Sequence, residues 1–277
     1  MSDTQHHQLA DGSKVQISRN GRHQYWIGDD GPKMKSVTSM LKHVEGDTFG
    51  VGMNWTRKKI NEAIFPELVG QSFQKTRTKS VKEQRLDFVV NSRGAGPMEI
   101  TPETLLRHTN AADDASSQST EMGNRLHEAV DAYIRHGTIT EDDPLFLAWF
   151  NEVGKANEEL WLASELFLYN PALEPNYGGT VDAISMDARG EVVIWDWKTK
   201  EKDSYEKYGG YLHEHAQLAA YADALRAMGS VYTPTKGCIA YIMRDGSYVD
   251  VVEIDLERGS KLFNASRELF LLTQGGE

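Results

Sequence analysis

The sequence predicts an α/β fold, in which helices cover an α+β mixed sheet. From residue 122 onward, the hydrophobic pattern predicts a helical pair, three strands, a helix, two strands and a last helix. Short turns join neighbouring strands: DARG between the second and third, and Asp245-Gly246 between the last two. Both turns favour antiparallel hairpins. The strands are expected at 165–171, 179–186, 191–199, 237–244 and 247–255, and the helices after the third strand at 213–229 and 257–274.

Two helices are expected before the first of these strands. Thr101 and Pro102 are typical of a helix start, and DASSQS at 114–119 is expected to break that helix. The segment 121–137 then places several apolar residues on one helical face, and Gly137 ends it. A second helix follows around 144–161.

Residues 1–100 are expected to form an N-terminal extension, and residues 101–277 the core domain. The runs KVQISR and HQYWIG flank Gly21 and predict a hairpin. Ser36 or Thr38 could cap a short helix in SVTSMLKHV, and WTRKKINEAI continues as a helical segment.

Composition and charge limit the function classes. The chain has 277 residues, 39% of them hydrophobic, which is enough for one large core. No apolar run approaches the roughly 18 residues of a membrane span, so no membrane partner is expected. The net charge of −11 counts against a general nucleic-acid coat, but not against a site whose carboxylates hold divalent cations. The single cysteine, Cys238, and a polar N-terminus without the apolar centre of a secretory signal favour a cytoplasmic location.

The stretch 71–93 differs in charge from the rest of the chain. It holds six basic residues against two acidic ones, a local charge of +4. One hypothesis is a solvated surface segment. The other is a segment that follows the phosphates of a nucleic acid.

Two carboxylates and a lysine are the strongest candidates for chemistry. Asp182 lies within one predicted strand, and Asp196 and Lys198 lie two apart in the next, so both face the same side of the sheet. Charged residues inside apolar strands are costly unless they pair or bind a metal. A divalent cation between the carboxylates would offset their repulsion, and oxygen ligands suit Mg²⁺ or Mn²⁺. A plain ion pair between Asp196 and Lys198 is the alternative.

GTVDAI followed by IWDWK resembles the pattern of the PD-(D/E)XK nuclease superfamily, and the predicted element order matches its restriction-endonuclease-like αβββαβ core. Gln217 and Tyr221 resemble the Q-x-x-x-Y element of the RecB-type branch, and Gly123 and His127 its G-x-x-x-H element. SVTSML followed by NWTRKK is similar to the start of phage and mitochondrial-type exonucleases of this branch.

The resemblance implies roles for several residues. Asp182, Asp196 and Lys198 would be catalytic, with Glu165 as a further acidic residue. His127, Asp182, Asp196 and the Trp197 carbonyl would bind metal, and a histidine ligand makes Mn²⁺ support plausible. The chain lacks the cysteines of the iron-sulfur cluster found in helicase-nuclease relatives. DNA would be bound by Gln217, Tyr221, Trp55, Lys75, Arg77, Lys79, Lys82 and Arg85.

The expected function is a metal-dependent DNA exonuclease that cuts from or near ends, prefers single strands, and serves phage-type recombination, repair or DNA processing. A helicase or recombinase could be a separate partner chain, because no P-loop is present. The expected setting is the cytoplasm of a bacterium or of a phage-infected cell. Two alternatives remain: an endonuclease of the same fold, for structured or foreign DNA, and a non-catalytic DNA-binding subunit.

Overall fold

The computed structural model describes residues 3–41 and 102–274, apart from gaps at 10–11, 22–23, 29–30, 32, 158–159 and 175. Within the first helix of the second range, side chains are described from residue 117 onward. No helix among the described residues combines the length and the apolar character needed to cross a membrane.

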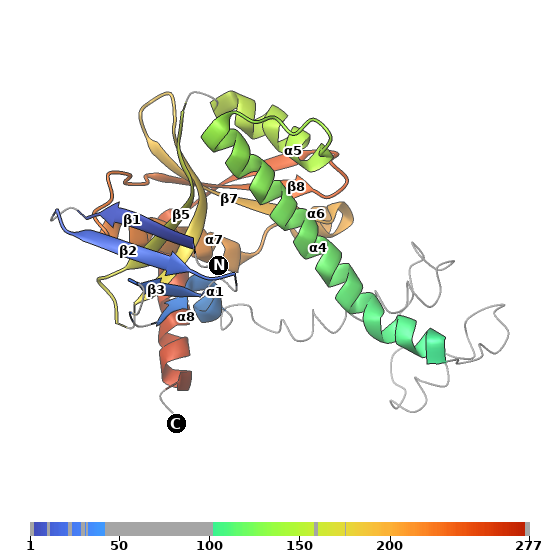
Figure 1. The fold of residues 1–277 in the computed structure, drawn as a ribbon, viewed down its shortest axis with the longest axis horizontal. Helices are drawn as coiled ribbons and strands as arrows, with labels where there is room; N and C mark the ends of the chain where they lie inside the picture. Colours follow the sequence, from blue (N-terminus) through green and yellow to red (C-terminus); the bar gives the residue numbers. More distant parts are fainter. Residues whose placement is uncertain are drawn as a thin grey trace. The chain divides into compact units, whose positions relative to one another are not determined.

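A nine-stranded mixed sheet organises the fold (Figure 1). Its main order is β1-β2-β3-β4-β6-β7-β8-β9, and β5 pairs with β6. The β4–β6 and β7–β8 pairs are parallel and the others are antiparallel. The strands are β1 (Asp3–Gln8), β2 (Lys14–Arg19), β3 (Tyr25–Ile27), β4 (Lys33–Ser36), β5 (Trp161–Asn170), β6 (Tyr177–Met186), β7 (Val192–Lys200), β8 (Lys236–Met243) and β9 (Val249–Ile254).

Helices cover the sheet through two separate cores. On one side, α1, α7 and α8 pack on the apolar residues of β5, β6 and β8. On the other, α4 and α5 pack on a tryptophan-rich cluster that includes Trp149, Trp195 and Trp197. The helices are α1 (Val37–Leu41), α4 (Pro102–His136), α5 (Pro144–Trp149), α6 (Lys202–Tyr208), α7 (Leu212–Ala227) and α8 (Leu256–Gln274), with short π and 3-10 turns at Phe150–Gly154 and Lys155–Asn157.

The structure confirms the predicted α/β class, and most predicted elements appear within a few residues of their expected ends. The predicted break at 114–119 is wrong, because α4 continues without interruption to His136. Gly137 ends it as expected, with a φ of 67° that favours glycine. Ser36 is the cap of α1, since its hydroxyl accepts a hydrogen bond from the Ser39 amide at 3.2 Å. The patterns missed β1, β4 and α6, which are short or polar.

The N-terminal strands belong to the same sheet as the predicted core. Residues Met1–Gly46 and Glu121–Glu277 form one compact unit, and Asp47–Thr120 forms a second. The expected boundary between residues 100 and 101 lies outside the described residues and stays a prediction, as does the basic segment at 71–93.

Candidate active site

A pocket of about 1110 Å³ brings together side chains from both sheet and helices. It lies within the unit formed by residues 1–46 and 121–277. It is lined by residues of β1–β4 and α1, together with residues of α4, β5, β6, β7 and α7. The pocket is lined by every predicted site residue of the described ranges except Trp197: His127, Glu165, Asp182, Asp196, Lys198, Gln217 and Tyr221.

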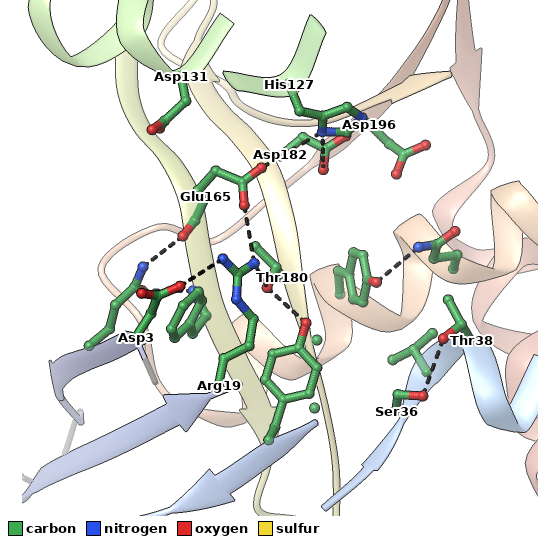
Figure 2. A pocket seen from close by; sticks show the side chains of 18 of the residues that line it. Asp3, Arg19, Ser36, Thr38, His127, Asp131, Glu165, Thr180, Asp182 and Asp196 are labelled. Carbon is green, nitrogen blue, oxygen red and sulfur yellow. Dashed lines mark hydrogen bonds and ion pairs between the residues drawn. The ribbon is translucent and has the colours of Figure 1, made fainter. Parts of the chain in front are cut away.

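Three of these residues form a group that could hold a metal ion. His127, Glu165 and Asp182 each offer one ligand atom, and these atoms lie within 4.8 Å of one another. His127 Nδ1 lies 3.5 Å from Asp182 Oδ1 and 3.7 Å from Glu165 Oε1 (Figure 2). The second oxygen of Asp182 accepts a hydrogen bond from the Trp197 amide at 2.7 Å, which fixes the orientation of the carboxylate. Helix α4 and strands β5 and β6 thus contribute one ligand each.

Buried charges shift the pKa values of this group. Burial alone would lower the pKa of His127, but the negative charges of Asp182 and Glu165 outweigh burial and raise it to about 9. Burial, reinforced by the charge of Asp196, raises the pKa of Asp182 to about 7, although His127 lowers it. At neutral pH, a protonated imidazole therefore supplies the positive charge between the two carboxylates.

Metal binding is expected to depend on pH through His127. A cation must displace the imidazole proton, so the apparent affinity for Mn²⁺ should rise about tenfold per pH unit between the Asp182 pKa of about 7 and the His127 pKa of about 9, and more steeply below pH 7, where Asp182 must also lose a proton. In the metal-free protein, the raised pKa of His127 makes the fold less stable as the pH rises. The stability from protonated His127 is complete below its ordinary pKa of 6.5, and is lost as the pH rises through about 9.

Calorimetry in two buffers of different ionisation enthalpy would count the protons released as Mn²⁺ binds. We expect close to one proton from the wild-type protein at pH 7.5 and fewer from His127→Gln. Equal release from the two proteins would contradict the assignment of this proton to His127.

Asp196 and Lys198 form an ion pair beside this group. Both oxygens of Asp196 lie within 2.8 Å of Lys198 Nζ, and the Asp196 side chain is almost fully buried. Burial alone would lower the pKa of Lys198, but Asp196 and Asp182 raise it above its ordinary value. Trp197 points to the opposite side of the strand, where its ring meets Trp149 edge-on, with ring centres 5.4 Å apart. The two-residue strand period thus separates the charged residues from the apolar core.

Gln217 and Tyr221 share one face of α7, as their spacing predicts. Gln217 Nε2 donates a hydrogen bond to the Tyr221 hydroxyl at 2.9 Å. The Tyr221 ring packs against Gly179 of β6, where an added Cβ would lie 2.4 Å from a ring carbon. The absence of a side chain at Gly179 therefore lets α7 bring this pair to the pocket.

The pocket also contains residues that sequence reasoning missed. Arg19 and Tyr25 come from the N-terminal strands, and Thr180 lies two residues before Asp182 on β6. The Tyr25 hydroxyl and Thr180 Oγ1 are 2.9 Å apart, within hydrogen-bond distance. No pattern marked these residues, because a lone arginine or tyrosine in a short strand has many structural explanations. Trp55 and the basic residues Lys75, Arg77, Lys79, Lys82 and Arg85 lie outside the described residues.

The charge balance of the pocket fits a bound cation. Its permanent cations are Arg19, Arg135 and Lys198, whereas its carboxylates are Asp3, Glu128, Asp131, Glu165, Asp182 and Asp196. A polyanion would be repelled by this excess of negative charge unless cations offset it. One imidazole and two carboxylates at close range suit Mn²⁺, and the carboxylates also suit Mg²⁺. Asp196, which was predicted as a metal ligand, lies outside this group of three and pairs with Lys198. Metal binding by the Trp197 carbonyl stays a prediction.

The comparison with protein families identifies the region that carries this pocket. Residues 145–257 match the model of the PD-(D/E)XK nuclease superfamily. This PD-(D/E)XK domain runs from α5 to the start of α8. A solved structure described as "Crystal structure of SSO0001" is 17% identical, with a TM-score of 0.34, and the match covers 79% of this chain and 86% of that chain. No curated protein matched the chain.

The PD-(D/E)XK domain contains only part of the pocket. Asp182 on β6 and the Asp196-x-Lys198 tripeptide on β7 lie inside it, together with Glu165, Gln217 and Tyr221. His127 on α4 precedes it, and so do all pocket residues of β1–β4. The pocket is therefore completed by elements that lie before the matched region in the sequence.

Proposed function

We propose that this chain is a metal-dependent DNA exonuclease that hydrolyses phosphodiester bonds from or near ends and prefers single-stranded DNA. The observation that carries the proposal is one pocket in which His127, Glu165 and Asp182 form a ligand group beside the Asp196–Lys198 pair. The match of residues 145–257 to the PD-(D/E)XK superfamily supports the reaction class.

His127, Glu165 and Asp182 would hold the cation, with Asp196 close by on the neighbouring strand. A divalent cation at such a position polarises a phosphate oxygen and lowers the pKa of water. The protein supplies the geometry, since Asp182 is fixed by the Trp197 amide and Glu165 by contacts on both sides. These side chains are thus oriented before the substrate arrives.

Lys198 would act as a fixed positive charge. Its raised pKa keeps the ammonium group protonated at neutral pH, so it stabilises the negative charge that develops on the phosphate rather than accepting a proton. Asp196 holds the ammonium group in place through both carboxylate oxygens. Gln217 and Tyr221 line the same pocket and would position the DNA beside this charge.

The preference for ends and single strands, and a role in phage-type recombination, repair or DNA processing, rest on the resemblance of the sequence motifs. The basic stretch at 71–93 would follow the phosphates of the strand. A helicase or recombinase chain could deliver the substrate.

The test is a cleavage assay on end-labelled linear single-stranded DNA, linear duplex, and a covalently closed single-stranded circle, with Mg²⁺ or Mn²⁺. We expect the linear single strand to be shortened and the circle to survive. Cutting of the circle would instead favour an endonuclease. Intact substrates with both metals, from a folded protein, would reject the nuclease proposal.

A further inference from the structure

Glu165 has an unusual backbone conformation within β5. Its φ is 48°, and it is the one non-glycine residue with positive φ among those the structure describes. Its neighbours Ser164 and Leu166 pair with Ala183 and Val181, so the register places Glu165 opposite Asp182. A left-handed conformation is unfavourable for a non-glycine residue and persists only where the surroundings impose it. The contacts around Glu165 should therefore explain why it keeps this conformation.

The N-terminal strand β1 holds the backbone directly after this residue, on both sides of Leu166. Gln5 Nε2 donates a hydrogen bond to the Glu165 carbonyl at 2.7 Å, and Gln5 Oε1 accepts one from the Phe167 amide at 2.7 Å. The Gln5 side-chain amide thus makes the two hydrogen bonds that a neighbouring strand would make at the edge of β5 not paired with β6. Because both bonds need the same glutamine in one orientation, they fix the local path of β5.

Strand β2 holds the carboxylate of the same residue. Arg19 Nη1 lies 3.4 Å from Glu165 Oε2 and 3.3 Å from Thr180 Oγ1, and its Nη2 lies 3.2 Å from Asp3 Oδ2. The guanidinium carbon is 4.6 Å from the ring centre of Phe167. Figure 2 shows Glu165 between Arg19 on one side and His127 on the other. One carboxylate oxygen therefore faces Arg19, while the other faces the ligand group.

Helix α4 fixes the residue that precedes Glu165. Arg135 Nη2 donates a hydrogen bond to the Ser164 carbonyl at 3.1 Å, and Asp131 accepts one from the Ser164 hydroxyl. The same helix carries His127, so α4 positions one ligand directly and contacts the residue next to the other, Glu165. The left-handed residue is thus held from α4 and from the N-terminal strands.

We propose that Gln5 and Arg19 are positioning residues, by which the β1–β2 hairpin aims Glu165 at the divalent cation held with His127 and Asp182. This inference rests on the proposed function for the cation itself. It goes beyond that function because it assigns the completion of the ligand group to a hairpin outside the region that matches the nuclease superfamily. A purely structural hairpin would extend the sheet without affecting the affinity for the cation.

Electrostatics allows the two roles of Arg19 to be distinguished. A guanidinium near the ligand group repels a metal ion, so the loss of its positive charge, taken by itself, would tighten metal binding. Loss of positioning would weaken it, because groups that orient a ligand are typically worth about 10–100-fold in metal affinity. The sign of the change in Arg19→Ala therefore identifies the dominant role. Gln5 is neutral, so Gln5→Ala tests positioning without any change of charge.

The experiment measures Mn²⁺ affinity of the full-length chain by calorimetry, with thermal unfolding of each variant as a check on folding. We expect Gln5→Ala and Arg19→Ala to weaken binding by on the order of tenfold, and Arg19→Lys to recover part of the loss. Gln8→Ala, an exposed glutamine on the same strand, and Arg258→Ala, an exposed arginine on α8, are the matched controls and should bind as the wild type does.

A double-mutant cycle with Glu165→Ala shows whether Gln5 acts through Glu165. In that background, Gln5→Ala should cause no further loss of affinity. An equal loss in both backgrounds, unchanged affinity in Gln5→Ala, or tighter binding in Arg19→Ala would overturn the inference. A wild-type protein that binds no Mn²⁺ would overturn the proposed function instead, so the two failures are distinguishable. If Arg19→Ala unfolds, Gln5→Ala and Arg19→Lys still decide the question.

Discussion

Replacing Asp182 by asparagine is expected to abolish metal-dependent cleavage of DNA. Both carboxylate oxygens of Asp182 have a partner. One oxygen faces His127, and the other accepts a hydrogen bond from the Trp197 amide. Asparagine keeps the size but removes the charge that a cation requires. The loss of one preorganised electrostatic group costs on the order of 10²–10³-fold in rate, and loss of the cation adds to that.

The fold should tolerate this change. The Asp182 carboxyl is largely buried and repelled by Asp196, and both effects raise its pKa to about 7, so a neutral side chain relieves electrostatic strain. We expect Asp182→Asn to unfold at the same temperature as the wild type, or higher, in the absence of metal. Thermal unfolding and a single-turnover cleavage assay on the same preparation measure both quantities. An Asp182→Asn protein that cuts at the wild-type rate with Mn²⁺ would exclude Asp182 from catalysis.

Breaking the Asp196–Lys198 pair should affect stability and activity differently. Asp196→Asn leaves a largely buried ammonium group without its counter-charge, which is expected to cost up to about 3 kcal/mol of unfolding free energy. Asp196→Asn combined with Lys198→Gln removes both charges, so most of this stability should return. Cleavage should be lost in both proteins, because Asp196→Asn no longer holds the Lys198 ammonium group in position and the double variant removes that group.

Chemical denaturation of the single and double variants gives the two unfolding free energies, and the cleavage assay gives the rates. Lys261→Gln is a suitable control, because Lys261 forms an exposed ion pair with Glu257 on α8 and such pairs contribute little. Recovery of cleavage together with stability in the double variant would show that the pair is only structural.

Local patterns were sufficient for strands β6 and β7, which carry Asp182, Asp196 and Lys198. Alternation with period two placed Asp196 and Lys198 on one face and Trp197 on the other, and the DARG turn joined the two strands as a hairpin. Helical spacing placed Gln217 beside Tyr221. The break expected at 114–119 failed because serine and aspartate disfavour a helix only weakly, and the long helix α4 overrides that preference.

The sequence by itself determined which residues carry charge into the sheet and which face each of them takes, because backbone geometry repeats over two or four residues. The position of Glu165 beside His127 and Asp182 was decided only by the tertiary structure. Its supports Gln5 and Arg19 lie about 150 residues earlier in the chain, with separations of 160 and 146. No local period links residues so far apart. Their contacts exist because the N-terminal hairpin lies against β5, where the long side chain of Gln5 reaches the backbone and that of Arg19 reaches the Glu165 carboxylate.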